Sequence, residues 1–240
     1  MHRLIIRISA ALITFTLGVG GVAIYRLNEA TPTIPVVEQH VEVTIIPFPA
    51  VCYPGRSVPT NAMAKGLYFP PKVFSENDWG DESYANWFSS HLRAMNEEPL
   101  HVWDDGATES YRFLWLRSFH HPVAVNIWSC GSERFIAVKE MSGAGGYEPG
   151  NLILHQQRTL TTDEWNHFIR LFDNTCFWQL PTPNAILGND GAQWIFEAVK
   201  RGRYHVVDRW SPRGGSYREL CLYMLELSGL KVDTAIEPLY

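Results

Sequence analysis

Side chains that could perform acid/base chemistry gather between residues 190 and 212, in the stretch "DGAQWIFEAVKRGRYHVVDRWSP". Glu197, Asp208 and His205 are of the types that move a proton in general acid/base catalysis. Tryptophan and arginine in the same stretch are typical of binding surfaces. Which of these side chains meet depends on how the backbone folds back on itself.

The centre of this stretch predicts a β-hairpin. Arg201-Gly202 has the composition of a two-residue turn, in which glycine supplies the positive φ that the turn needs. This turn places Trp194 opposite Arg209, where the guanidinium can lie over the indole ring. Such a cation–π contact is worth about 0.5–1 kcal/mol at an exposed site, and we expect the pair to belong to a binding face.

The other face of the hairpin carries the acidic pair. Glu197 and Asp208 are diagonal neighbours there, near enough to share a proton, a cation or an arginine. With His205 they are the catalytic candidates, because a pocket that raised one carboxyl pKa would allow acid/base chemistry. The alternative is that these charges only solvate an outer face, over an inner face made of Trp194, Phe196 and Val207.

Neither a phosphate loop nor a metal site is expected. The glycine-rich run "SGAGGYEPG" at 142–150 is followed by a strand instead of a helix, which favours a long hairpin loop. His120 and His121 are adjacent, so in a strand they would point to opposite faces. No zinc-binding spacing occurs, and we expect no metal and no cofactor.

Hydrophobic periodicity around these candidates predicts an α+β fold. Residues 110–119, 122–130, 134–141 and 151–157 have strand character, and residues 80–99, 159–174 and 216–230 contain helical patterns. Short turns between the strands indicate local connections. The expected architecture is an antiparallel meander sheet and a C-terminal β-hairpin packed with about three helices, preceded by one N-terminal transmembrane helix.

The N-terminus indicates a membrane anchor. Residues 8–25 carry no charge and would span about 27 Å as a helix, close to the hydrocarbon thickness of about 30 Å. We expect a signal-anchor at 1–27 that contacts the membrane through 4–25, a linker at 28–35, and one extracytoplasmic domain at 36–240. Arg3 and Arg7 favour an N-terminus inside the cell; cleavage after the small residues near 21–23 would give a secreted protein instead.

Charge and cysteine content limit the setting further. A formal net charge of −5 lacks the basic excess of most nucleic-acid-binding proteins, so nucleic acid is not expected as a partner. Outside the cytoplasm, the four cysteines are candidates for up to two disulfides of undetermined pairing, with buried free thiols as the alternative. They are Cys52, Cys130, Cys176 and Cys221.

Several segments together resemble a known group of proteins. "GYEPG" at 146–150, the strands "DGAQWIFE" and "YHVVDRWSP", and the closing "ELSGL" are similar to an uncharacterised set of bacterial proteins that are exported or membrane-anchored. The resemblance covers about residues 110–230. It implies a cell-envelope setting and brings no activity with it.

The sequence therefore predicts a single-pass inner-membrane protein of the cell envelope. Its extracytoplasmic domain is expected to act by binding or as a structural element, with an envelope protein as a candidate partner. The alternative is an envelope hydrolase that uses Glu197, Asp208 and His205.

Overall fold

A computed structural model describes residues 43–44, 68–75, 78–102, 109–183, 188, 190–232 and 239. The N-terminal segment expected to cross a membrane lies outside these residues. Within the described part of the chain, no helix is long and apolar enough to span a membrane. The transmembrane helix therefore stays a prediction.

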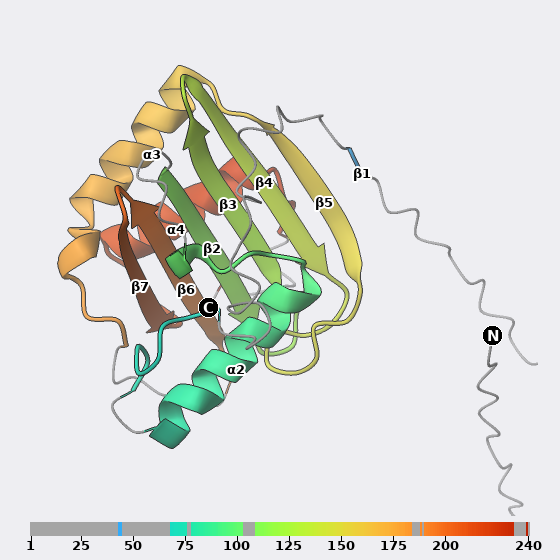
Figure 1. Ribbon diagram of the computed structural model, residues 1–240. Coiled ribbons are helices and arrows are strands. Elements are labelled where there is room, and N and C mark those ends of the chain that lie inside the picture. The colour runs from blue at the N-terminus through green and yellow to red at the C-terminus, as the bar shows by residue number, and fades with distance from the viewer. Residues whose placement is uncertain are drawn as a thin grey trace, which may run out of the picture. The chain divides into compact units, whose positions relative to one another are not determined.

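The centre of the structure is a sheet of six antiparallel strands (Figure 1). The strands are β2 (Glu109–Arg117), β3 (Val123–Cys130), β4 (Glu133–Met141), β5 (Leu152–Thr159), β6 (Ala192–Lys200) and β7 (Arg203–Trp210). Their spatial order is β5-β4-β3-β2-β6-β7, and the two-residue β1 (Val43–Thr44) pairs in parallel with β5 at one edge. The predicted α+β class is confirmed, as is a meander (β2 to β5) beside a C-terminal hairpin (β6 and β7).

Three α-helices pack on the sheet, as expected. They are α2 (Asp78–Ala94), α3 (Thr162–Asn174) and α4 (Ser216–Ser228), with short 3-10 turns at η1 (Leu100–Val102) and η2 (Phe177–Gln179). Helix α3 begins with a capping box, in which Thr161 and Glu164 each satisfy the other's backbone N–H; the spacing of these two residues in the sequence predicts it. Helix α4 ends where Gly229 adopts a left-handed conformation with φ of 72°, which glycine adopts without steric cost.

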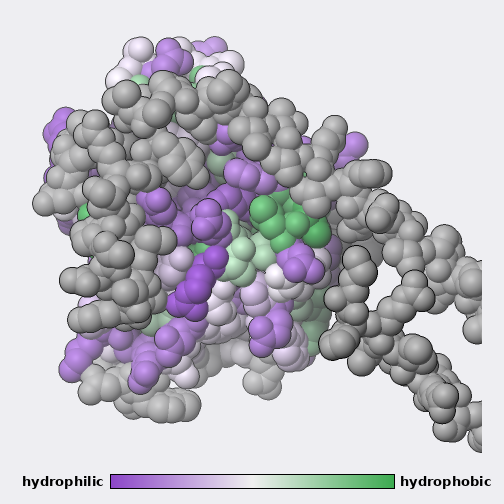
Figure 2. Space-filling model, turned by 45° about the vertical axis from the view of Figure 1, so that its right-hand side comes forward, coloured by the Kyte–Doolittle hydropathy of each residue, from purple (hydrophilic) through white to green (hydrophobic). Residues whose placement is uncertain are grey.

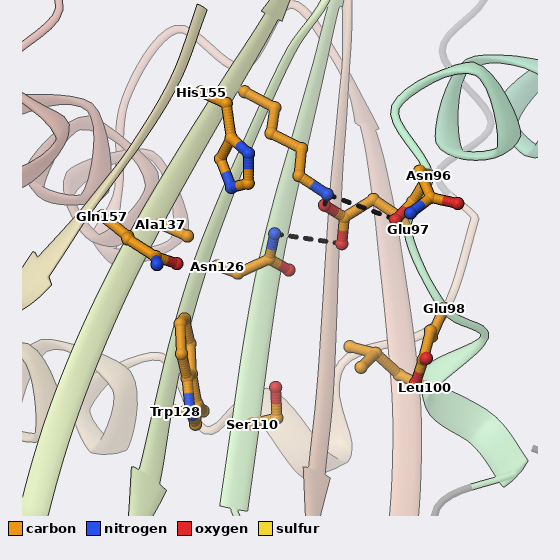
Figure 3. A pocket seen from close by; sticks show the side chains of 11 residues that line it. Asn96, Glu97, Glu98, Leu100, Ser110, Asn126, Trp128, Ala137, His155 and Gln157 are labelled. Carbon is orange, nitrogen blue, oxygen red and sulfur yellow. Dashed lines mark hydrogen bonds and ion pairs between the residues drawn. The ribbon is translucent and has the colours of Figure 1, made fainter. Parts of the chain in front are cut away.

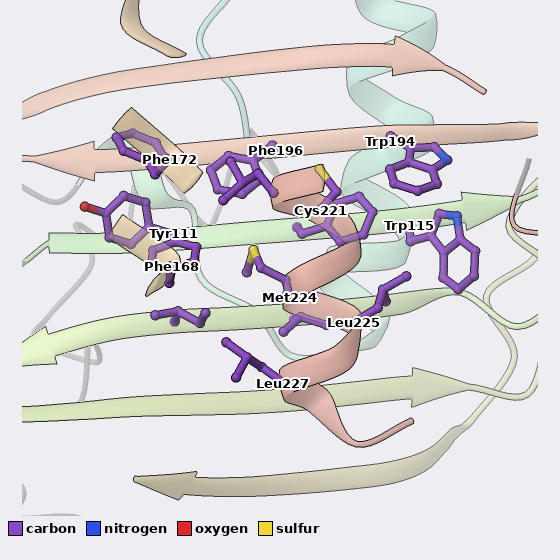
Figure 4. Packing of buried hydrophobic residues seen from close by; sticks show 14 of the residues in the cluster. Tyr111, Trp115, Phe168, Phe172, Trp194, Phe196, Cys221, Met224, Leu225 and Leu227 are labelled. Atoms are coloured by element: carbon purple, nitrogen blue, oxygen red, sulfur yellow. The ribbon is translucent and has the colours of Figure 1, made fainter. Parts of the chain in front are cut away.

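The helices cover both faces of the sheet. Helices α3 and α4 lie behind it in Figure 1, and α2 crosses its front. On the α3/α4 side the core is rich in aromatic rings, which pack with the apolar face of α4 (Figure 4). On the α2 side, Phe88 and Leu92 of the helix pack with Phe69 against Leu114 and Ile195 of the sheet.

The central strands are buried on both faces, whereas the sequence predicted a solvated outer face for the C-terminal hairpin. Strands β2, β3 and β6 have almost no exposed residue along their length, although their sequences contain charged and polar side chains. Such side chains therefore lie inside the protein, and each needs a partner there. On the side shown in Figure 2 the described surface is mainly hydrophilic, with a small apolar area between polar side chains.

The glycine-rich run at 142–150 connects β4 to β5 as a hairpin loop, as predicted. Its amides are already used: Gly143 N–H donates to the carbonyl of Pro149 and Gly145 N–H to that of His120. A Cβ at Gly145 would come 2.6 Å from the backbone of β2, so only glycine allows this close approach. The loop is therefore packed on the sheet and does not form a phosphate cradle.

Candidate functional site

The predicted register of the C-terminal hairpin is confirmed. Trp194 is paired with Arg209, and the pairing continues without a shift to the turn. Arg201 and Gly202 form this turn with φ values of 53° and 72°, the positive values that a type I′ turn requires. The sequence thus determined which side chains share a face.

The cation that stacks on Trp194 differs from the expected one. Arg209 lies over the ring of Tyr217, with its Cζ 5.6 Å from the ring centroid, while Arg218 of α4 lies over Trp194 at 5.7 Å. Trp194 is 0% exposed, because α4 packs on this face. It is a core residue, and its ring is not available at the surface.

Glu197 and Asp208 are buried, which corrects the expectation of a solvated outer face. They are 0% and 9% exposed, because α2 and residues 68–75 form a second layer over this face. They lie on the face opposite to Trp194, as the register predicted. Their surroundings differ: Glu197 is ion-paired, whereas the Asp208 carboxyl has no hydrogen-bond partner at Oδ1 among the described residues.

His205 lies on the α3/α4 side, away from both carboxylates. Its Nε2 is 2.8 Å from the carbonyl oxygen of Leu180, and its ring packs edge-on against Phe177. Burial lowers the pKa of His205. The three catalytic candidates therefore do not converge on one place.

A buried ion pair joins β2 to β6. Arg112 donates from Nε to Oε2 of Glu197 over 2.7 Å, and both side chains are 0% exposed. Tyr204 donates its hydroxyl to the other oxygen of Glu197 over 2.8 Å. Arg112 also donates from Nη1 to the carbonyl oxygen of Glu98, 2.7 Å away, and so reaches the segment that follows α2.

A second ion pair fixes the same segment to β4. Lys139 lies 2.8 Å from Oε1 of Glu97 and donates to the carbonyl oxygen of Met95 over 2.9 Å. Asn126 of β3 donates to Oε2 of Glu97 over 3.1 Å. Figure 3 shows the Glu97 carboxylate extending from the segment after α2 toward the strands, where Asn126 donates to it. We call Arg112, Glu197, Glu97 and Lys139 the buried charge cluster.

The buried charge cluster is electrically balanced, with two acids and two bases. Burial by itself raises the pKa of Glu97, but Lys139 and Arg112 outweigh it and lower the value. The two carboxylates likewise hold the pKa of Arg112 above its usual range against the effect of burial. For Glu197, burial outweighs the charge of Arg112 and raises the pKa, but its two oxygens are occupied by Arg112 and Tyr204. A carboxylate engaged in this way is poorly placed to exchange a proton with a substrate.

A small polar pocket adjoins the cluster. Its volume is about 50 Å³, room for one or two water molecules. Burial and then the charge of Glu97 raise the pKa of Glu98 on one wall, and burial and then Lys139 lower the pKa of His155 on another. The space is far below the roughly 300 Å³ at which ligand pockets begin, so this pocket has the size of a hydration site.

A larger pocket opens at the other end of α2, and we call it the aromatic pocket. Its volume is about 220 Å³. Four of its lining side chains are aromatic, coming from α2, from the glycine-rich loop and from the end of β7. The lining residues are Tyr84, Trp87, Ser118, Gly146, Tyr147, Gly188, Asp190, Gln193 and Trp210.

Gln193 at the floor of the aromatic pocket is unusual. It is 5% exposed, and its Oε1 has no hydrogen-bond partner within the described residues. Gln193 is paired with Trp210, and the next pair on the same face of the hairpin is Ile195 with Asp208. Burial raises the pKa of Asp208 to about 7. Two buried acceptors thus lie at or next to this pocket without a donor, a costly arrangement in the absence of a ligand.

The described residues bear on the expectations for a metal site and for disulfides. No group of three metal-ligating side chains occurs there. Cys176 is an exposed free thiol and Cys221 a buried one, so the described residues do not contain the two-disulfide arrangement in which all four cysteines pair. Cys52 lies outside the described residues.

No protein-family model, curated protein or solved structure matches this chain. The arrangement of its side chains therefore carries the functional inference.

Sequence reasoning missed most residues of both sites. Arg112 and Lys139 look like ordinary strand charges, and Gln193 and Trp210 looked like parts of a hairpin face and its end. One signal was present: β2 and β6 are too apolar for a strand with one solvated face, and a charge within such a strand indicates a buried ion pair. Nothing in the sequence placed the glycine-rich loop next to the end of β7.

Proposed function

We propose that this protein is a membrane-anchored domain of the cell envelope that acts by binding, and that its ligand site is the aromatic pocket. The observation that carries this proposal is the unpartnered, buried Oε1 of Gln193 under four aromatic side chains. Ligand sites are typically apolar and aromatic with a few polar groups that lack partners until the ligand arrives. The resemblance to exported bacterial proteins supports the same setting.

The hydrolase alternative has weaker support. Its carboxylate Glu197 is held in an ion pair with Arg112, and His205 lies on the opposite side of the sheet. General acid/base catalysis needs groups within hydrogen-bond reach of one substrate. The geometry therefore favours binding over hydrolysis.

A disulfide would support placement outside the cytoplasm. Because Cys176 and Cys221 are free thiols, only Cys52 and Cys130 remain as an intramolecular pair, and we propose that they are joined. Cys130 lies at the end of β3 and is not one of the two free thiols. Disulfide bonds persist in oxidising compartments. We expect two reactive thiols in the denatured, unreduced protein and four after reduction; four before reduction would rule the disulfide out.

A photo-crosslinker tests the binding function directly. Tyr147 is 65% exposed at the rim of the aromatic pocket, so p-benzoylphenylalanine at this position should leave the fold intact. In cells that make the full chain, irradiation should give a discrete adduct from position 147. The same probe at the exposed Glu133, in the far β3–β4 hairpin, should not give it. Absence of an adduct at 147, or the same adduct from both positions, would contradict a ligand at this pocket.

The exposed thiol tests the side of the membrane. A membrane-impermeant maleimide should label Cys176 in intact spheroplasts, while Cys176→Ser removes the label because Cys221 is buried. Labelling that requires lysis would place the domain inside the cell.

A further inference from the structure

Among the described residues, the one charged side chain in the lining of the aromatic pocket is the carboxylate of Asp190. Apart from the aromatic residues, Ser118 and Gln193 are its polar neutral side chains, and no lysine, arginine or histidine lines the pocket within the part of the chain that the structure describes. The carboxyl of Asp208 lies close enough to Tyr84 that, after burial, its charge is what raises the pKa of this phenol. A carboxylate together with the unpartnered Oε1 of Gln193 indicates a ligand that brings its own N–H groups or a positive charge.

Two of the four aromatic side chains, Trp87 and Trp210, are held in place before any ligand binds. Trp87 donates from Nε1 to the carbonyl oxygen of Gly145 over 2.8 Å, which ties its ring to the glycine-rich loop. Trp210 packs on Gly188 and Gly191, where neither position has room for a side chain. A cation near the face of such rings is attracted by their electron density, and fixed rings lose little entropy on binding.

The volume limits what can enter. About 220 Å³ is less than the roughly 300–1,000 Å³ that encloses a whole drug-sized molecule. The pocket therefore fits a compact headgroup, with the rest of a larger ligand left outside. An anionic group beside that headgroup would approach the carboxylate of Asp190, and the described lining offers no basic residue to receive it.

We propose that the aromatic pocket binds an organic ammonium group, primary or methylated, on a ligand that carries no anion beside it. This inference rests on the proposed binding function and names its ligand class. The ammonium contacts the aromatic rings and lies near Asp190, and the N–H groups of a primary ammonium donate to Oε1 of Gln193.

Binding of choline to the detergent-solubilised full chain, followed by tryptophan fluorescence, tests the charge preference. The control ligand is 3,3-dimethylbutan-1-ol, which has the same shape without the charge. We expect choline to bind at least about ten-fold more tightly, which corresponds to about 1.4 kcal/mol. Equal affinity for the two would overturn the ammonium class, and so would a lack of binding by both choline and ethanolamine, which carries a primary ammonium.

A second pair of ligands tests the exclusion of an anion. Glycerophosphocholine carries a phosphate next to the same ammonium group, as a lipid headgroup does. Weaker binding than that of choline is expected, and tighter binding would overturn the preference for a ligand without an anion and point to a lipid headgroup instead.

Matched variants place the binding at this pocket. Tyr147→Ala removes an exposed ring of the lining, and Phe119→Ala removes its exposed neighbour, whose ring lies 6.1 Å from that of Tyr147 but does not line the pocket. Tyr147→Ala and Asp190→Asn should each weaken choline binding about two- to five-fold, while Phe119→Ala should not. Equal effects of Tyr147→Ala and Phe119→Ala would overturn the site. A cross-link at position 147 combined with no binding of either choline or ethanolamine would refute the ammonium class alone and leave the binding function standing.

Discussion

Arg112 and Glu197 form an ion pair with both side chains fully buried, across the two central strands β2 and β6. Removing one member of such a pair leaves the other charged and without its partner, which typically costs about 3–5 kcal/mol. We therefore expect Glu197→Gln to lower the free energy of unfolding by about that amount in urea denaturation. Glu133→Gln, at an exposed position on β4, should change it by less than about 0.5 kcal/mol. Similar small effects for both would mean that Glu197 is not ionised in the native state.

We expect the substitution Asp208→Asn to increase the free energy of unfolding at high pH. Burial raises its folded pKa from 3.8 to about 7, so the native state holds the proton more tightly than the unfolded chain. The contribution of this group is therefore fully present below pH 4 and is lost as the pH rises toward 7. Asp208→Asn, which imitates the protonated form, should be more stable than the native protein at pH 8, by an amount on the order of a few kcal/mol.

Thermal unfolding at pH 4 and pH 8 measures this difference. The gain from Asp208→Asn should shrink toward pH 4, where the native carboxyl is protonated as well. Asp173→Asn, at an exposed position of α3, provides the control and should show no such change. A constant difference across the pH range would contradict the shifted pKa.

For His91 we expect the stability of the fold to depend on pH in the opposite direction. It is 0% exposed in the α2 core, and burial lowers its pKa from 6.5 to about 4. The unfolded chain takes up the proton first, so stability is lost as the pH falls from about 6.5 toward 4, by an amount on the order of 3 kcal/mol. In His91→Gln this loss should disappear from the acid limb of the stability curve. The exposed His167, changed in the same way, should leave that limb intact.

The capping box of α3 gives a local test. The Thr161 hydroxyl accepts from the backbone N–H of Glu164 over 3.2 Å, and loss of such a cap costs about 1 kcal/mol. Thr161→Ala should lower the unfolding free energy by about this amount, whereas Thr162→Ala, one residue further on and also exposed, should cost less. The reverse order of the two variants would show that the cap does not contribute as described.

Much of the fold could be predicted because local patterns specify it. The alternation of apolar residues gave the strands, and Arg201-Gly202 specified the register of β6 and β7 because a two-residue turn permits only one pairing. The start of α3 followed from Thr161 and Glu164, which satisfy backbone groups within one turn of helix. Each of these decisions involves residues that are close together in the sequence.

The sites could not be predicted in the same way. Register placed Glu197 and Asp208 on one face, but only the packing of α2 and residues 68–75 over that face made it an interior. The partner of Glu197, Arg112, is 85 residues away in the sequence, and the aromatic pocket joins α2, the glycine-rich loop and the end of β7. The sequence by itself determined the elements, the hairpin register and the face on which each side chain lies, because turns, caps and alternation act over a few residues. Only the tertiary structure decided which face is covered and what each buried charge meets, because burial and ion pairing depend on segments that are distant in the chain.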